Sequence, residues 1–149
     1  MTGLLLHCKQ FRYRDRSNST RPFGIARVVE GRALTAETHK NAVVILTCIE
    51  EGDSDTHIAL AAAHVDHMMR EWYTTASAMV VLPFAHLSGD IAQPPAAMPS
   101  LTLFLQHLGT HGYRPSLATF GSHKDWMVDV YGYPRATSWF AFRQRPSLN

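Results

Sequence analysis

The stretch VLPFAHLSGDIAQPPAAM, residues 81–98, decides the fold and raises the question of function. It completes an apolar run over residues 78–85, which predicts a strand buried on both faces of a sheet. His86 stands at the end of that strand, and Pro94 and Pro95 stiffen the return to the next element. Because open α/β sheets bind ligands at the ends of their strands, His86 is a candidate site residue. The alternative is that His86 only holds the loop by a hydrogen bond.

The segments around this stretch predict further strands. Residues 42–49 are rich in β-branched residues and predict a central strand, and residues 3–13 predict an opening strand. Residues 14–27 predict a loop. Near the end of the chain, apolar residues alternate with polar ones in residues 126–131 and return in residues 138–142. These last two segments predict a β-hairpin closed by a Gly-Tyr-Pro turn.

Two segments have the apolar periodicity of amphipathic helices. The first begins after Ser54 or Asp55, either of which can cap a helix. Its apolar stripe is Ile58, Ala61, Ala62, Val65, Met69 and Trp72. The second follows three prolines and ends at Gly109 or Gly112. Its stripe is Leu101, Phe104, Leu105 and Leu108. Strands that alternate with helices predict an α/β domain.

The composition is that of one soluble domain. The 149 residues are 46% hydrophobic and 17% charged, which predicts one core over residues 1–149. No apolar run approaches the roughly 20 residues that cross a bilayer. Residues 1–10 lack the cleavage site of a secretory signal. Cys8 and Cys48 have no metal-ligand spacing, and we expect both to be reduced in a cytoplasmic protein that binds no membrane.

Basic residues gather at both ends of the chain, although the net charge is only +2. The first 32 residues contain Lys9, Arg12, Arg14, Arg16, Arg21, Arg27 and Arg32. The C-terminal end contains Arg135, Arg143 and Arg145. A phosphate-rich partner such as RNA suits this distribution. The alternative is a solvated basic loop with no partner.

The other candidate motifs predict no metal and no cofactor. His64 with His67, and His107 with His111, have helical spacings that suit two ligands, but neither pair has a third ligand nearby in the sequence. The chain has no glycine-rich phosphate loop, no GxSxG nucleophile elbow and no HExxH zinc motif. Cys8 lies in an apolar strand and is more typical of a core residue than of a nucleophile.

A second polar stretch interrupts strand-like sequence at residues 120–125. Gly121 permits a close backbone approach, and His123 places an imidazole directly before the ammonium of Lys124. We expect this stretch and His86 to form one site, at a hollow that accepts a small acyl group.

Residues 83–98 resemble the PFAHLS...A.P..AM motif in the N-terminal editing domain of archaeal threonyl-tRNA synthetases, which shares its fold with D-aminoacyl-tRNA deacylases. LLLHCKQFRY, residues 4–13, is similar to the family's opening strand. FGSHKDW, residues 120–126, and GYP, residues 132–134, are similar to its FG-x-x-K and G-x-P segments. The resemblance covers nearly the whole chain. It implies a mixed, barrel-like sheet with two main helices.

The resemblance also implies an enzyme, an aminoacyl-tRNA hydrolase that removes serine wrongly attached to threonine tRNA. His86 and Lys124 match the family's substrate-pocket histidine and catalytic lysine. The positions that would line the aminoacyl pocket are Ala85, Ala97, Met98 and Ile49. Such hydrolysis needs a positioned water and stabilisation of the developing oxyanion, with no covalent nucleophile and no cofactor.

Two residues depart from the family pattern. His123 stands where the family commonly has tyrosine, and Thr137 stands where it has glutamate after the G-x-P turn. In the family, the residues at both positions belong to the hydrogen-bond network that orders the attacking water. The resemblance also implies that Thr137 contacts the substrate. An imidazole at position 123 is an alternative general base, since it exchanges a proton near neutral pH.

Three functions remain open from the sequence. The first is proofreading of seryl-tRNA by a free-standing domain that acts in trans. The second is deacylation of D-aminoacyl-tRNA or another mischarged tRNA. The third is a tRNA-binding module without catalysis. Because the related domains are dimers, we also expect a homodimer.

Overall fold

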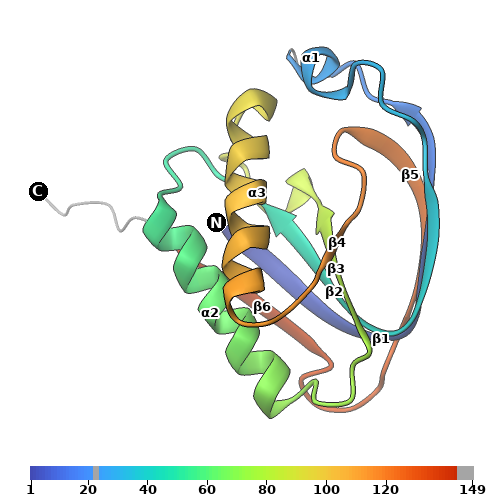
Figure 1. Ribbon diagram of the computed structural model, residues 1–149, viewed down its shortest axis with the longest axis vertical. Coiled ribbons are helices and arrows are strands. Elements are labelled where there is room, and N and C mark those ends of the chain that lie inside the picture. The colour runs from blue at the N-terminus through green and yellow to red at the C-terminus, as the bar shows by residue number, and fades with distance from the viewer. Residues whose placement is uncertain (22–23, 144–149) are drawn as a thin grey trace, which may run out of the picture.

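The computed structural model describes residues 1–21 and 24–143, which form a six-stranded mixed sheet with two long helices on one face (Figure 1). The elements in chain order are β1 (Thr2–Asn18), α1 (Ile25–Val29), β2 (Ala36–Cys48), α2 (Asp55–Glu71), β3 (Ala78–Pro83), the 3₁₀ turn η1 (Ala85–Leu87), α3 (Pro94–Thr110), β4 (Ser116–Leu117), β5 (Ser122–Val130) and β6 (Thr137–Ala141). None of the helices in the described part of the chain is long and apolar enough to cross a membrane.

The sheet is curled into an open half-barrel. Its strand order is β4-β3-β2-β1-β5, with β2, β3 and β4 parallel to one another and β1 antiparallel to β2. In Figure 1, β1 and β2 run together to the bottom of the molecule and turn back up beside β5. The start of β5 therefore approaches the ends of β2 and β3, and this approach positions the candidate site.

The core lies on both faces of the central strands. Along β2, Val43 and Ile45 pack toward α2 and α3, whereas Val44 and Leu46 pack into the inside of the curl. β3 alternates in the same way and is buried on both faces, as its continuous apolar sequence predicted. Each large aliphatic side chain buried here contributes about 1.5–3 kcal/mol to folding.

The two predicted helices are confirmed, but some residues of their expected apolar stripes differ in burial. Ser54 caps α2 in a capping box, because its hydroxyl accepts from the His57 amide at 3.4 Å and its amide donates to the His57 ring at 3.2 Å. Met68 is buried in place of the expected Trp72, which is 40% exposed and lies beneath the Arg135 guanidinium at 4.5 Å. α3 buries the expected stripe except for Leu105, which is partly buried.

Two predictions about the strands are wrong. The loop expected over residues 14–27 contains the end of β1 and the first residues of the short helix α1. β1 continues because its residues alternate between the two faces of the sheet. Tyr13 and Asp15 face inward, whereas Arg12, Arg14 and Arg16 face solvent. The expected hairpin does not form either. Both β5 and β6 pair with β1, which is long enough to offer its first residues to β6 and the rest to β5.

Cys8 and Cys48 are free, buried cysteines, as the sequence predicted. Burial raises the pKa of Cys8 to about 12 and that of Cys48 to about 11. Thiols with raised pKa values are poor nucleophiles near neutral pH, so both cysteines act as core residues.

Candidate functional site

Two adjoining hollows lie where β3 ends, with volumes of about 400 Å³ and 250 Å³. They share the side chains that follow β3 and those that begin β5, and form two lobes of one site. The shared lining residues are Pro83, Phe84, Ala85, His86, Ser122 and His123. The larger lobe extends to Ile49, Ala97 and Leu101, which make it apolar. The smaller lobe extends to Lys124 and Trp126.

The curl of the sheet brings these residues together. Parallel pairing sets Pro83 beside Thr47, so β2 and β3 end at the same rim. β5 reaches this rim from the far arm of the curl, and the residue just before it, Gly121, has a φ of +73°. A Cβ atom on Gly121 would lie 2.6 Å from Ile25 Cδ1 and 2.7 Å from Val29 Cγ1. Glycine is therefore required here for its conformation and for the close packing of α1.

Glu50, two residues beyond the end of β2, holds the loop that carries His86. Its carboxylate is almost fully buried and accepts from the hydroxyls of Ser88 at 2.5 Å and Thr2 at 2.8 Å. It also lies 2.7 Å from the Arg143 guanidinium and 3.1 Å from the amino group of Met1. Burial alone would raise the pKa of Glu50, but these hydrogen bonds and charges outweigh it and the pKa is lowered.

Backbone hydrogen bonds fix the same loop to the residues after β2. The amide of Glu51 donates to Asp90 O at 2.8 Å, and the amide of Ala92 donates to Ile49 O at 3.0 Å. The loop is therefore held at both its ends and its middle, which gives His86 a defined position.

Lys124 lies on β5 with its side chain only 9% exposed. Its amino group donates to Ser122 Oγ at 2.6 Å and Ser122 O at 3.2 Å, and also to Thr119 O. Asp15 Oδ1 lies 3.6 Å away. Burial lowers the pKa of Lys124, and the charge of Asp15 opposes that effect. The surrounding oxygen atoms are acceptors, which suit an ammonium group better than a neutral amine.

Asp15 is the buried counter-ion of Lys124. Burial by itself would raise its pKa, but hydrogen bonds from Ser122 Oγ at 2.6 Å and the Thr35 amide at 2.9 Å, together with Lys124, outweigh burial and lower it. The carboxylate is therefore ionised at neutral pH. The small lobe is thus backed by an ordered ion pair.

The structure brings most of the expected site residues together. His86 and His123 have exposed side chains and line both lobes, and the His86 ring lies edge-on to Phe84 with centroids 5.2 Å apart. Ala85 lies beside them. Ile49 and Ala97 line the larger lobe, and Lys124 lines the smaller one.

Met98 and Thr137 are not brought to either lobe. Met98 is partly buried and packs against the core between helices and sheet. Thr137 is exposed at the start of β6, paired with Leu6. The start of β5 pairs instead with Asn18, at the opposite end of β1. The position of β6 along β1 therefore separates Thr137 from the hollow.

Asp15 and Glu50 were not predicted from the sequence. Asp15 falls in phase with the buried residues Phe11 and Tyr13, so an alternation extended past Tyr13 would have revealed an inward-facing carboxylate. Glu50 had a weaker signal, which is an acidic residue directly after a buried strand.

The paired histidines do not assemble into a metal site. Within residues 1–21 and 24–143, no group of three or more His, Cys, Asp or Glu side chains is placed to hold a metal ion. The His64 ring packs against Phe140 with centroids 5.4 Å apart, and burial lowers its pKa. His64 thus belongs to the packing of α2 against the sheet.

A family model described as the archaea-specific editing domain of threonyl-tRNA synthetase matches residues 1–141. The chain belongs to this family. The threonine–tRNA ligase of Thermofilum pendens is 33% identical to it over 136 residues, which are 90% of the chain and 21% of that protein. The threonine–tRNA ligase editing subunit of Saccharolobus solfataricus is 30% identical over 96 residues, 64% of the chain and 24% of that protein. The chain spans about a fifth of the length of the first curated relatives it matches.

Solved structures confirm the predicted fold of this editing domain. A probable eukaryotic D-amino acid tRNA deacylase has a TM-score of 0.59 at 11% identity, covering 94% of this chain and 99% of that chain. A c-Myc DNA unwinding element binding protein has a TM-score of 0.67 at 10% identity, covering 97% of this chain and 100% of that chain. The α/β fold is therefore the D-aminoacyl-tRNA deacylase-like fold.

Proposed function

We propose that this editing domain hydrolyses the ester bond of mischarged aminoacyl-tRNA, that its substrate is serine attached to threonine tRNA, and that it acts on charged tRNA in trans in the cytoplasm. The observation that carries the proposal is that His86, which follows the end of β3, and Lys124, near the start of β5, line the same hollow. Family membership supports the same function.

The small lobe supplies the electrostatics that ester hydrolysis needs. Lys124 holds positive charge beside the reacting carbonyl and stabilises the oxyanion as water attacks. Asp15 keeps that charge in place from behind, at 3.6 Å. His123, at the mouth of both lobes, exchanges protons with solvent, and His86 holds the amino group or terminal ribose of the substrate. Water is the nucleophile, so no acyl-enzyme forms.

The larger lobe selects the amino acid by shape. Its walls of Ile49, Ala97 and Leu101 are apolar, and Ala97 lies on α3 behind the stiff Pro94–Pro95 turn. Serine and threonine differ by one methyl group, which supports a discrimination of only about 1–3 kcal/mol on binding. A second site that admits serine and excludes threonine multiplies that discrimination.

The test is release of amino acid from a panel of charged tRNAs. Threonine tRNA carrying serine, threonine or alanine, and a tRNA carrying a D-amino acid, are each incubated with the domain. We expect serine to be released at least 10-fold faster than threonine. Faster release of the D-amino acid would assign the activity to D-aminoacyl-tRNA. Binding of every tRNA with no release would leave a binding module and overturn the proposal.

We also propose that the domain works as a homodimer, as its resemblance to the editing-domain family implies. Light scattering coupled to size-exclusion chromatography gives the mass in solution. A mass of twice 16.7 kDa supports the proposal, and a mass of 16.7 kDa at micromolar concentration contradicts it.

A further inference from the structure

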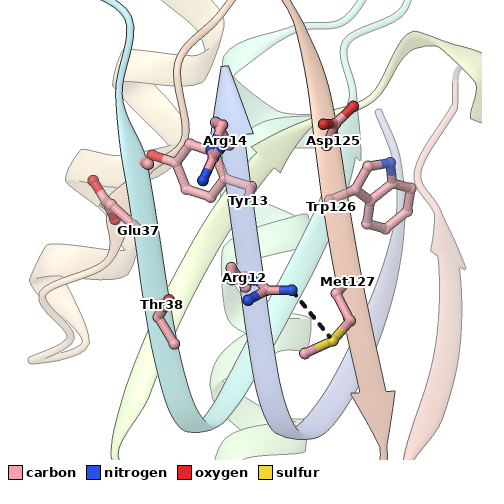
Figure 2. A pocket seen from close by; sticks show the side chains of 9 residues that line it. Arg12, Tyr13, Arg14, Glu37, Thr38, Asp125, Trp126 and Met127 are labelled. Atoms are coloured by element: carbon pink, nitrogen blue, oxygen red, sulfur yellow. Dashed lines mark hydrogen bonds between the residues drawn. The ribbon is translucent and has the colours of Figure 1, made fainter. Parts of the chain in front are cut away.

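A third hollow, of about 470 Å³, lies on the outer face of the curled arm of the sheet, away from the core (Figure 2). β1 forms its floor, with β2 on one side and β5 on the other. Arg12 and Arg14 both stand on this floor because alternate residues of β1 face outward. They are two positions apart, so their Cα atoms are about 6.7 Å apart.

The cations of this face are more available than its anions. The exposed carboxylate of Asp125 is already paired with Arg16. Glu37 lies 2.8 Å from the His39 ring. Arg12 reaches only the Met127 sulfur, at 4.0 Å, and no ion pair of Arg12 or Arg14 occurs among the described residues (Figure 2). Two guanidinium groups therefore face solvent over one shallow hollow.

Trp126 joins this hollow to the candidate site. It lines both the outer hollow and the small lobe that contains Lys124. The indole is 41% exposed, and its inner edge rests on Phe84 with ring centroids 5.8 Å apart. In Figure 2 it lies beside β5, on the side away from Arg12 and Arg14. An exposed, supported aromatic ring next to free guanidinium groups is typical of sites that bind single-stranded nucleic acid.

We infer that the single-stranded end of the RNA substrate crosses β5 at Trp126, with its phosphates on Arg12 and Arg14 and one base stacked on the indole. This inference rests on the proposed function. Guanidinium groups bind phosphate oxygens in a bidentate way, and bases of any sequence stack on an aromatic ring. The path ends at the small lobe, where the ester is cleaved. It explains how a domain of this size holds a long substrate by its last nucleotides.

The test compares two substrates that share the ester and differ in phosphates. One is seryl-tRNA and the other is the 3′-seryl ester of adenosine. The variant R12A/R14A is expected to raise KM for seryl-tRNA at least 10-fold, with a loss below twofold on the adenosine ester. The slope of log KM against log salt falls by about 1.4, since each phosphate contact on a single strand contributes about 0.7. The matched control R70A/R114A removes two exposed arginines outside this face and leaves KM unchanged.

Trp126 is tested separately because it also supports Phe84. W126A is expected to reduce kcat/KM on seryl-tRNA about 10-fold, in line with about 1–3 kcal/mol for a stacked base. W126F keeps a stacking ring and restores most of the activity. An equal loss on the adenosine ester for both variants would show that Trp126 only shapes the lobe, and would remove it from the path.

Binding measurements separate failure of this inference from failure of the proposed function. If wild-type protein hydrolyses neither substrate, fluorescence anisotropy with labelled, uncharged tRNA still reports the path. Weaker binding by R12A/R14A than by R70A/R114A supports it. Equal binding and equal salt slopes for the two variants overturn the inferred RNA path. Displacement of the RNA by a glutamate-rich peptide at equal charge concentration also overturns it, because it would indicate an acidic protein partner.

Discussion

The amino group of Lys124 lies 3.6 Å from Asp15 Oδ1, in a place where both side chains are almost fully buried. The two residues face each other because β5 and β1 are paired at this position. A buried pair of this kind determines both the position of the lysine and its protonation state. The hollow therefore depends on a carboxylate that does not itself face the substrate lobes.

Asp15→Asn is expected to move the alkaline limb of the pH–rate profile toward lower pH. Burial already lowers the pKa of Lys124, and Asp15 is the group that raises it. Without the carboxylate, burial is no longer opposed, so the ammonium is lost at a lower pH than in wild type. The measurement is kcat for deacylation across the alkaline range. Asp129→Asn, which removes an exposed carboxylate from β5, the strand of Lys124, is the control. An unshifted limb in D15N would exclude a charged Lys124 from the reaction.

Glu50→Gln is expected to loosen the loop that carries His86. The change leaves the Met1 amino group and Arg143 without their shared carboxylate, and replaces an acceptor of the Ser88 hydroxyl. The Met1 amino group keeps its pair with Asp53 and Arg143 is half exposed, so the expected cost is about 1–3 kcal/mol, that of leaving a buried polar group unsatisfied. Hydrogen exchange should rise for amides in residues 84–92 at a temperature where the fold is intact.

The pH dependence of stability provides a second readout for Glu50. Its pKa is lowered in the folded protein, so its contribution to stability is present above its ordinary value of 4.5 and is lost as the pH falls through the folded value. The unfolding free energy of wild type should therefore drop more steeply on acidification than that of E50Q. Parallel curves for the two proteins contradict the network.

Gly121→Ala is expected to destabilise the fold by about 2–4 kcal/mol. The positive φ disfavours any side chain, and the added Cβ would meet Ile25 and Val29 on α1. Gly132→Ala is the control, because nothing lies within 4 Å of a Cβ there and its φ is not positive. Denaturant unfolding measures both, and a loss in G121A no larger than that in G132A would argue against this packing.

His123→Ala is expected to retain deacylation within about 10-fold. His123 is exposed at the mouth of the lobes, so it can pass protons to solvent without holding the substrate in place. His123→Tyr introduces the residue that the resemblance to the family implies at this position and should keep the rate in the same range, and single-turnover deacylation measures both variants. Complete loss of activity in both variants would make His123 essential.

Much of this fold is readable from local pattern. Residues 42–49, 78–85 and the two helical stripes have periodicities that depend only on which faces are buried, and the structure confirms the strands and helices there. The partners of β5 and β6 were not readable, because an alternating segment pairs equally well with its neighbour in sequence or with a distant strand. Pairing of both with β1 is a property of the whole sheet.

The candidate site was only partly predictable for the same reason. His86 and Lys124 were found through a strand end, an unusual polar stretch and a family motif, which are all local features. Asp15 and Glu50 act through residues far along the chain, at Lys124 and Ser88, so no motif contains them. Thr137 was expected at the substrate from its place after a turn, but the register of β6 places it opposite Leu6.

The most direct measurement of the central claim is single-turnover deacylation of seryl-tRNA by wild-type protein and by Lys124→Met. Methionine keeps the length and apolar stem of the side chain and removes the charge. With K124M the rate is expected to be at least about 100-fold lower, as for loss of an oxyanion-stabilising group, and tRNA binding is expected to stay within twofold of wild type. A rate equal to that of wild type would contradict the assignment of this hollow as the place where the ester is cleaved.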